Sequence, residues 1–383
     1  MSSISLPKPL IFGISGTSVN ELERDFYSKI QPVGFVLFRK NLVDKSQSKK
    51  LCEELRLMLG RENAPILVDQ EGGSVNRLKS PTWREPLSPL ELAKFAYSEI
   101  DDNIARTAKL INLNAQLIAY EMQEIGINVN CAPVADLLIP GAHHITANRS
   151  FGTDPHITAI LASSMIEGMQ KYGVQGTIKH MLGQGRAKAD SHLSLPVLSD
   201  SLKTLENNDF AVFKNIKNAK WGMTAHIKYN CLDPIEPVTY SSAIVDYIRK
   251  VIGFDGILIS DCLTMKALPE TLAEKAAKTI NAGIDIALYG GANLDYFAEM
   301  ASNIPYMTEE ALLKVNSSFS YLTKQNVDYR EILAEYEDLF STMQNELDLL
   351  PKSSFSEELK FIIDILYERS SKEADYSSPL YKA

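Results

Sequence analysis

The sequence has few cysteines and no apolar run long enough to cross a membrane. Its cysteines, Cys52, Cys131, Cys231 and Cys262, lie far apart in a chain of 383 residues and form no Cys-x-x-Cys pair. This spacing argues against a disulfide framework and is typical of reduced cysteines with a packing role. The first nine residues also lack the apolar core of a signal peptide. We therefore expect a cytoplasmic protein that does not enter the membrane.

The sequence also lacks a basic cluster and a phosphate-binding loop. It contains 39 Lys and Arg against 48 Asp and Glu, which gives a net charge of −9. An acidic chain of this kind is a poor candidate for binding nucleic acid or anionic lipid. Neither a Gly-x-Gly-x-x-Gly turn nor a P-loop is present. We expect no cofactor. The sequence leaves the oligomeric state open, with a monomer favoured.

What the sequence does contain is an alternation of short apolar runs and helix-like segments. Several runs are apolar throughout, as in strands that are buried on both faces of a parallel sheet. Eight such repeats predict an α/β fold, a (β/α)₈ TIM-like barrel, and an open doubly wound sheet is the alternative. The eight runs are Pro9–Ile14, Val33–Phe38, Pro65–Asp69, Ile127–Val134, Val174–Lys179, Gly222–Ile227, Gly256–Ser260 and Ile284–Leu288.

After about residue 301 the strand-like runs stop and only helical segments follow. Thr308 and Asp328 are expected to cap two of these helices, and Ser354 is expected to cap a third over Leu359–Glu368. We therefore predict a barrel domain over residues 1–305 and a helical C-terminal extension over residues 306–383.

Polar side chains stand where the predicted strands end. In a parallel barrel these positions share one rim, where active sites form. The carboxylates Asp136 and Asp261 follow two strands, and a loop after another strand ends in Asp190 and His192. A carboxylate two positions from an imidazole can fix the tautomer of the ring and raise its basicity. The remaining candidates at this rim are Asp69, Arg149, Lys179, His180 and His226.

Two chemistries fit this set. Glycoside hydrolysis needs a nucleophile, for which Asp261 is suited, and an acid/base on a loop, for which Asp190 to His192 is suited. Asp69, Arg149, Lys179 and His180 would then hold sugar hydroxyls. The alternative is metal-assisted hydrolysis, although the first strand offers no His-x-His pair. Its possible ligands are His143, His144, His180, His226 and Asp261.

Five sequence blocks, in order along the chain, resemble the signatures of family 3 glycoside hydrolases. Val68–Leu78 contains the Asp-Gln-Glu-Gly-Gly signature, and Gly253–Met265 is similar to the block that carries the nucleophile. Asn130–Asp136 and Asn148–Gly152 are similar to two further blocks. Lys179–His192 resembles the catalytic loop of the NagZ-type bacterial β-N-acetylhexosaminidases within that family.

The resemblance implies a retaining mechanism with a covalent glycosyl-enzyme on Asp261. His192, held by Asp190, would act as the acid/base, and the reference pKa of histidine, about 6.5, suits that role. The positions that would bind N-acetylglucosamine are Asp69, Arg77, Arg149, Lys179 and His180. The implied substrate is a muropeptide, an N-acetylglucosaminyl-anhydro-muramyl fragment of peptidoglycan recycling.

The chain departs from the family pattern at four positions, none of which is a core catalytic position. They are Ser74 in place of Arg, Leu182 in place of Pro, Gln184 in place of His and Cys262 in place of Asp. Replacing the proline removes a restriction on the loop backbone, so we expect altered loop dynamics with function retained. A sugar-binding remnant with impaired catalysis is a further alternative.

Overall fold

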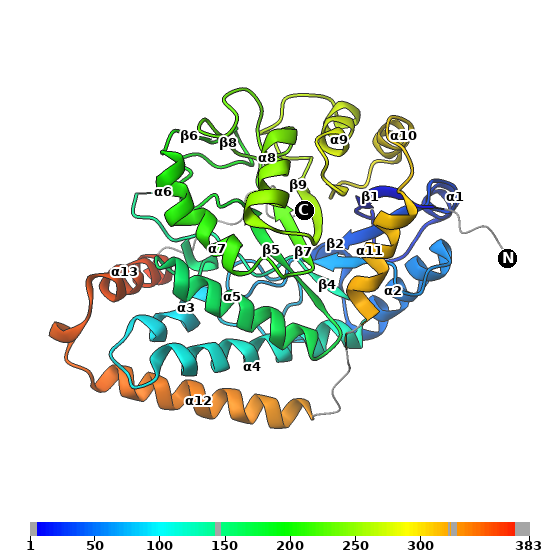
Figure 1. Ribbon diagram of the computed structural model, residues 1–383. Coiled ribbons are helices and arrows are strands. Elements are labelled where there is room, and N and C mark those ends of the chain that lie inside the picture. The colour runs from blue at the N-terminus through cyan, green and yellow to red at the C-terminus, as the bar shows by residue number, and fades with distance from the viewer. Residues whose placement is uncertain (1–5, 142–146, 321, 323–327, 372–383) are drawn as a thin grey trace.

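Eight parallel strands close into a barrel in the computed structural model, which describes residues 6–141, 147–320, 322 and 328–371. The order around the barrel is β1-β10-β9-β7-β5-β4-β3-β2, and β10 closes it by pairing with β1. The predicted TIM-like fold is therefore confirmed (Figure 1). The strands are β1 (Lys8–Phe12), β2 (Pro32–Leu37), β3 (Ile66–Val68), β4 (Val129–Asn130), β5 (Gln175–Met181), β7 (Trp221–Thr224), β9 (Ile257–Cys262) and β10 (Ile286–Tyr289).

Helices follow most strands and cover the outside of the barrel (Figure 1). The chain from Leu202 to Asn215 forms two helices divided at Asn208, and the helix that begins at Leu272 is capped by Thr271. The helices before residue 305 are α1 (Glu21–Ile30), α2 (Lys45–Leu59), α3 (Pro89–Ala93), α4 (Asn103–Glu124), α5 (Pro155–Gln170), α6 (Leu202–Asn207), α7 (Asp209–Asn215), α8 (Ser242–Tyr247), α9 (Leu272–Asn281) and α10 (Leu294–Ser302).

Strand β4 is much shorter than the predicted run over residues 127–134. Pro133 has no N–H to donate to a neighbouring strand. The Asn130 side chain provides cross-strand bonds instead. It accepts from the backbone N–H of Gln70 at 3.0 Å and donates to the Gln70 carbonyl at 2.9 Å. A small two-stranded sheet outside the barrel, β6 (Val197–Leu198) with β8 (Lys228–Tyr229), was not predicted.

The barrel interior is a separate apolar core that α11 (Glu309–Ser320) closes at the N-terminal ends of the strands. Val315 and Phe319 of α11 pack against interior side chains that include Trp221 and Ile257. The Trp221 indole N–H donates to the hydroxyl of Ser318 at 3.0 Å. This helix therefore packs with the barrel, although the predicted boundary at residues 305 and 306 assigns it to the extension. The boundary itself stays a prediction.

Two further helices, α12 (Tyr329–Leu349) and α13 (Glu357–Ser371), form the end of the described chain. Figure 1 shows α12 lying along α4, and Arg106 of α4 donates two hydrogen bonds to Glu346, at 2.6 and 3.1 Å. Thr308 and Asp328 cap α11 and α12 as predicted. The predicted Ser354 cap is wrong, because the hydroxyl of Ser356 accepts the Leu359 N–H at 3.1 Å.

Helix α13 also contacts the loop that leads to Arg149. Ile362 is completely buried and packs with Leu90 of α3 and with Leu138 and Ala147. Leu138 lies two residues after Asp136, and Ala147 lies two residues before Arg149. The extension therefore supports a loop that carries two candidate site residues.

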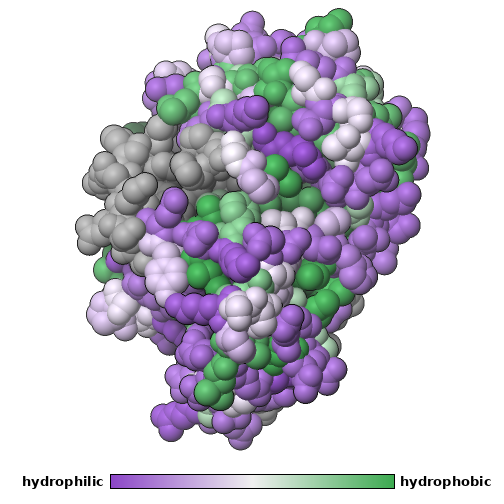
Figure 2. Space-filling model, turned by 90° about the vertical axis from the view of Figure 1, so that its left-hand side faces the viewer, coloured by the Kyte–Doolittle hydropathy of each residue, from purple (hydrophilic) through white to green (hydrophobic). Residues whose placement is uncertain are grey.

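The molecular surface carries no large hydrophobic face in the view of Figure 2. Hydrophobic side chains there form small patches that hydrophilic ones separate. Within the described part of the chain, no helix is both long enough and apolar enough to span a membrane.

We predict that Ile362→Ala lowers the free energy of unfolding by about 2–5 kcal/mol, because it leaves a cavity between α13 and the loop. Urea unfolding followed by circular dichroism measures this change. The control is Leu349→Ala on α12, where the side chain is 85% exposed and the expected change is within about 0.5 kcal/mol. Equal stabilities of the two variants would contradict the described packing.

Candidate active site

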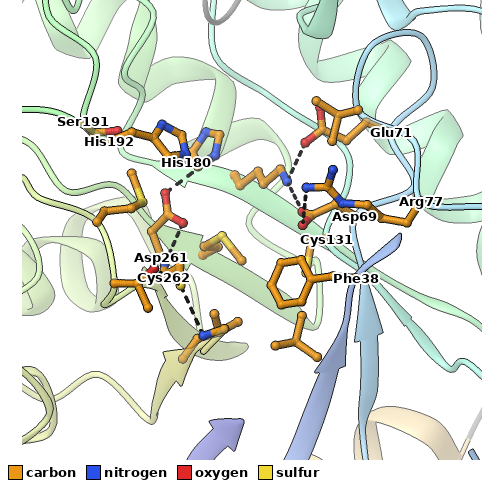
Figure 3. Close-up of a pocket in the computed structure, with 18 of the residues that line it drawn as sticks. Phe38, Asp69, Glu71, Arg77, Cys131, His180, Ser191, His192, Asp261 and Cys262 are labelled. Atoms are coloured by element: carbon orange, nitrogen blue, oxygen red, sulfur yellow. Dashed lines mark hydrogen bonds and ion pairs between the residues drawn. The ribbon is translucent and has the colours of Figure 1, made fainter. Parts of the chain in front are cut away.

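A cavity of about 330 Å³ opens at the C-terminal ends of the barrel strands. Figure 3 shows Asp261 and Cys262 on the same side of it as His180, Ser191 and His192, with Asp69, Glu71 and Arg77 on the other side. Seven residues predicted from the sequence line this cavity: Asp69, Arg77, Arg149, Lys179, His180, His192 and Asp261. The eighth, Asp190, contacts the His192 ring.

A buried ion network forms one wall of the cavity. Glu71, which is 1% exposed, accepts two hydrogen bonds from Arg149, at 2.7 and 2.8 Å. The Lys179 ammonium lies 2.6 Å from the Glu71 carboxylate and 3.0 Å from that of Asp69. Burial alone would raise the pKa of Glu71, but Arg149 and Lys179 outweigh it and hold this pKa well below its usual range. Each buried charge in this wall therefore has an opposite partner.

Asp69 also faces Arg77. One guanidinium nitrogen of Arg77 lies 3.7 Å from the Asp69 carboxylate, and the guanidinium carbon lies 5.9 Å from the centre of the Phe38 ring. The Gln70 side chain fixes the local turn by accepting the backbone N–H of Arg77 at 2.9 Å. Asp69 and Arg77 are only partly covered, so both can offer polar atoms to a ligand in the cavity.

His180 is oriented by Asp136. The Nδ1 atom of His180 lies 2.7 Å from the Asp136 carboxylate, which can only accept, so Nδ1 carries the proton. The other ring nitrogen, Nε2, lies 4.0 Å from the carboxylate of Asp261. Gln184 replaces the family histidine here, and its backbone N–H donates to Asp136 at 2.8 Å. The side-chain amide of Gln184 lies 2.9 Å from Nδ1 of His180, so this departure places a neutral amide beside that ring.

Asp261 lies on β9, with its carboxylate at the floor of the cavity. Burial would raise its pKa, but the nearby His180 and His226, with smaller contributions from the Cys262 backbone N–H and from His192, bring the pKa below its ordinary value. The carboxylate is thus stabilised in the ionised form that a nucleophile requires.

His226 is fully buried and contacts the residue after Asp261. Its Nε2 atom lies 3.1 Å from the carbonyl oxygen of Cys262, so Nε2 donates, and Nδ1 accepts from the hydroxyl of Thr239 at 2.7 Å. Burial lowers the pKa of His226, and the nearby Asp261 carboxylate opposes this shift. With both nitrogens used inside the protein, His226 is not placed to bind a metal ion.

The other proposed metal ligands give no cluster either. Among the described residues, no group of three or more His, Cys, Asp or Glu side chains is arranged to hold a metal ion. His143 and His144 lie outside the described residues, so the metal alternative is tested only for the rest of its ligand set.

The loop that carries His192 reaches the cavity and is bonded to the segment after Asp261. The Asp190 carboxylate accepts from the His192 ring Nδ1 at 2.8 Å and from its backbone N–H at 2.9 Å. The carbonyl oxygens of Ser191 and His192 accept the backbone N–H groups of Ala267 and Lys266, each at 3.2 Å. Two backbone bonds thus join the loop of the predicted acid/base to that of the predicted nucleophile.

Sequence reasoning did not identify Glu71 as the carboxylate that pairs with both Arg149 and Lys179. Glu71 was noted only as part of a motif, although its position two residues after Asp69 is a signal, because side chains at that spacing point to the same face of an extended chain. The other departures from the family pattern are accommodated. Ser74 donates to Asn148 at 3.2 Å, Leu182 is buried in the core, and the sulfur of Cys262 accepts from Gly290 at 3.2 Å.

Comparison with known proteins decides the family. Residues 13–315 match the glycosyl hydrolase family 3 N-terminal domain. The chain belongs to glycoside hydrolase family 3. It is 31% identical to a β-hexosaminidase of Tolumonas auensis over 319 residues, which cover 81% of this chain and 91% of that protein. A β-hexosaminidase of Psychromonas ingrahamii is 33% identical over 288 residues, or 73% of this chain and 82% of the relative.

Solved structures of the family agree with this assignment. NagZ from Neisseria gonorrhoeae, in complex with N-trifluoroacetyl-D-glucosamine, superimposes with a TM-score of 0.75 at 25% identity. The superposition covers 89% of this chain and 98% of that one. The family resemblance inferred from the sequence blocks is therefore confirmed.

We predict that Glu71→Gln lowers the free energy of unfolding by about 3–5 kcal/mol at neutral pH, because it removes the buried carboxylate that Arg149 and Lys179 share. The pKa of Glu71 is depressed, so its contribution is present above the ordinary glutamate pKa and is lost as the pH falls below it. The difference between wild type and variant should therefore shrink below about pH 4.

Urea unfolding across this pH range measures the effect. The control is Asp25→Asn, which breaks an exposed 2.7 Å ion pair with Lys29 and should change stability by less than about 1 kcal/mol. A Glu71→Gln variant as stable as this control at neutral pH would show that the network is not a stabilising one.

Proposed function

We propose that this family 3 β-hexosaminidase removes terminal β-linked N-acetylglucosamine from muropeptides by a retaining mechanism with two steps. The observation that carries the proposal is the pair of backbone bonds that hold the His192 loop against the segment after Asp261. This arrangement directs an imidazole and an ionised carboxylate into one cavity of a size suited to a sugar ring.

In the first step, an oxygen of Asp261 forms a bond to the anomeric carbon as the bond from that carbon to the leaving oxygen breaks. Protonated His192 donates its Nε2 proton to the leaving oxygen, while its Nδ1 proton stays hydrogen-bonded to Asp190. The Asp190 carboxylate stabilises the protonated ring and fixes its orientation. The products are the released alcohol and a glycosyl ester on Asp261.

In the second step, water attacks the anomeric carbon and the ester bond to Asp261 breaks. His192 takes the proton from the water, which restores its protonated form and returns Asp261 as a carboxylate. Two inversions at the same carbon leave its configuration unchanged. A histidine acid/base also avoids a second anion beside Asp261.

The charged wall of the cavity would bind the sugar hydroxyls. Asp69, Arg77, Arg149, Lys179 and His180 line the cavity, and Arg149 and Lys179 also bind the Glu71 carboxylate. Because the ion network orients these groups before a ligand arrives, little rotamer entropy is lost on binding. The NagZ complex with N-trifluoroacetyl-D-glucosamine supports a sugar with a 2-acylamino group at this site.

The muropeptide substrate rests on the resemblance of the catalytic-loop sequence, and we propose it together with a cytoplasmic location. Incubation of the enzyme with an N-acetylglucosaminyl-anhydro-muramyl peptide, followed by mass spectrometry, tests the substrate. Release of free N-acetylglucosamine supports it, and an intact disaccharide under conditions that cleave an aryl substrate would refute it.

We predict that the enzyme hydrolyses an aryl N-acetyl-β-glucosaminide with a kcat/KM at least about tenfold above that for the matching aryl β-glucoside, because the acylamino group adds binding energy. A release assay with the two substrates side by side measures the ratio. A ratio at or below one would reject the N-acetylglucosaminide assignment.

We predict that His192→Ala lowers kcat about 10²–10⁴-fold on an unactivated aryl N-acetylglucosaminide while the dissociation constant for N-acetylglucosamine changes little. Steady-state kinetics and calorimetric titration give the two quantities. His156→Ala, which changes an exposed histidine at the start of α5, is the matched control and should behave as wild type. Unchanged turnover in His192→Ala would refute the acid/base role.

A further inference from the structure

A buried lysine outside the cavity supports the segment that joins the two reacting groups. Lys275 lies in the first turn of α9 and is 6% exposed. Its ammonium donates to the backbone carbonyls of Leu263 at 3.0 Å and Met265 at 3.3 Å. Lysines are almost never buried to this degree unless they are paired. Burial lowers the pKa of Lys275, so the position costs free energy that the two bonds must offset.

The two carbonyls belong to the segment that follows Asp261. The carbonyl of the preceding residue, Cys262, accepts from the buried ring of His226, so three carbonyls within four residues are bound by buried side chains. The Leu263 N–H, in turn, donates to the Leu288 carbonyl of β10 at 2.9 Å. The segment is therefore fixed to the barrel on one side and to α9 on the other.

The next two residues of this segment hold the catalytic loop. Lys266 and Ala267 donate their backbone N–H groups to His192 and Ser191. The direction of these N–H groups depends on the peptide planes just before them, and Lys275 binds the carbonyl of Met265, which belongs to the same peptide unit as the Lys266 N–H. One buried ammonium thus fixes a peptide plane whose other end binds the His192 carbonyl.

We propose that Lys275 is a positioning residue that holds His192 in register with Asp261 for proton transfer. This inference rests on the proposed function of His192. An ammonium suits the task because it is a compact charge with three donors, and its bonds to carbonyls are stronger than those of a neutral group. Without it, two buried carbonyls lose their partner and the segment can rotate.

The experiment compares wild type with Lys275→Met on two aryl N-acetyl-β-glucosaminides, one with a 2,4-dinitrophenyl and one with a phenyl leaving group. The ratio kcat/KM reports the first step in both cases. The dinitrophenolate leaves without a proton, whereas the phenolate needs one from His192. A misplacement of a catalytic group by about 1 Å can lower the rate 10²-fold. We therefore expect Lys275→Met to lower kcat/KM roughly 10- to 100-fold on the phenyl substrate and less than about threefold on the dinitrophenyl substrate.

Lys278→Met is the matched control. Lys278 lies on the same helix, but its exposed ammonium pairs at 2.6 Å with Glu270, which lies beyond the residues that bond to the His192 loop. The same change of charge and side chain there should leave both kcat/KM values as in wild type. If Lys275→Met does not fold, Lys275→Gln, which retains a donor, is measured in the same way.

Equal losses of Lys275→Met on the two substrates would overturn the inference, because a general loss of structure lowers both rates alike. Absence of any loss would overturn it as well. Either outcome leaves the proposed function standing, provided that the wild type hydrolyses the two substrates. A wild type that hydrolyses neither would instead reject the proposed function, and the inference with it.

Discussion

The pairing of buried charges around Glu71 is the constraint on which the site depends. Two cations, Arg149 and Lys179, come from separate segments of the barrel and share this one carboxylate. Burying any one of these three charges alone would cost several kcal/mol of desolvation free energy, so the chain must bring them together when it folds. The network therefore places the segment after β3, the end of β5 and the short turn that contains Arg149 in one fixed relation, and the wall that we propose binds the sugar is built on that relation.

The part of the site that contains His192 and Asp261 is held by hydrogen bonds to the backbone instead of by paired charges. The His192 loop is joined to the segment after Asp261 by backbone hydrogen bonds, and buried side chains of His226 and Lys275 fix the carbonyls of that segment. A rigid wall of paired charges and a loop held through its backbone together suit the proposed mechanism. In that mechanism the wall would fix the ring of the substrate, and the loop would hold the proton donor beside it.

Sequence reasoning predicted the barrel because buried parallel strands are apolar throughout, and it found the site because polar residues interrupt this pattern at the ends of strands. It failed where a role depends on partners from distant segments. Glu71 gains its role from Arg149 and Lys179, and Lys275 gains its role from two backbone carbonyls. Neither set of contacts leaves a local pattern. The Ser354 cap was wrong because two serines fit the local signal, and only the actual start of α13 selects Ser356.

The central claim is that Asp261 and His192 act on the same anomeric carbon, and trapping of the intermediate tests it most directly. The wild type is incubated with a 5-fluoro N-acetylglucosaminyl fluoride, whose glycosyl-enzyme hydrolyses slowly, and is then analysed by intact mass and peptide mapping. The account predicts one sugar per chain, attached to the peptide that contains Asp261. Turnover of aryl N-acetylglucosaminide by the same preparation, with no sugar on Asp261 or with the sugar on another residue, would contradict it.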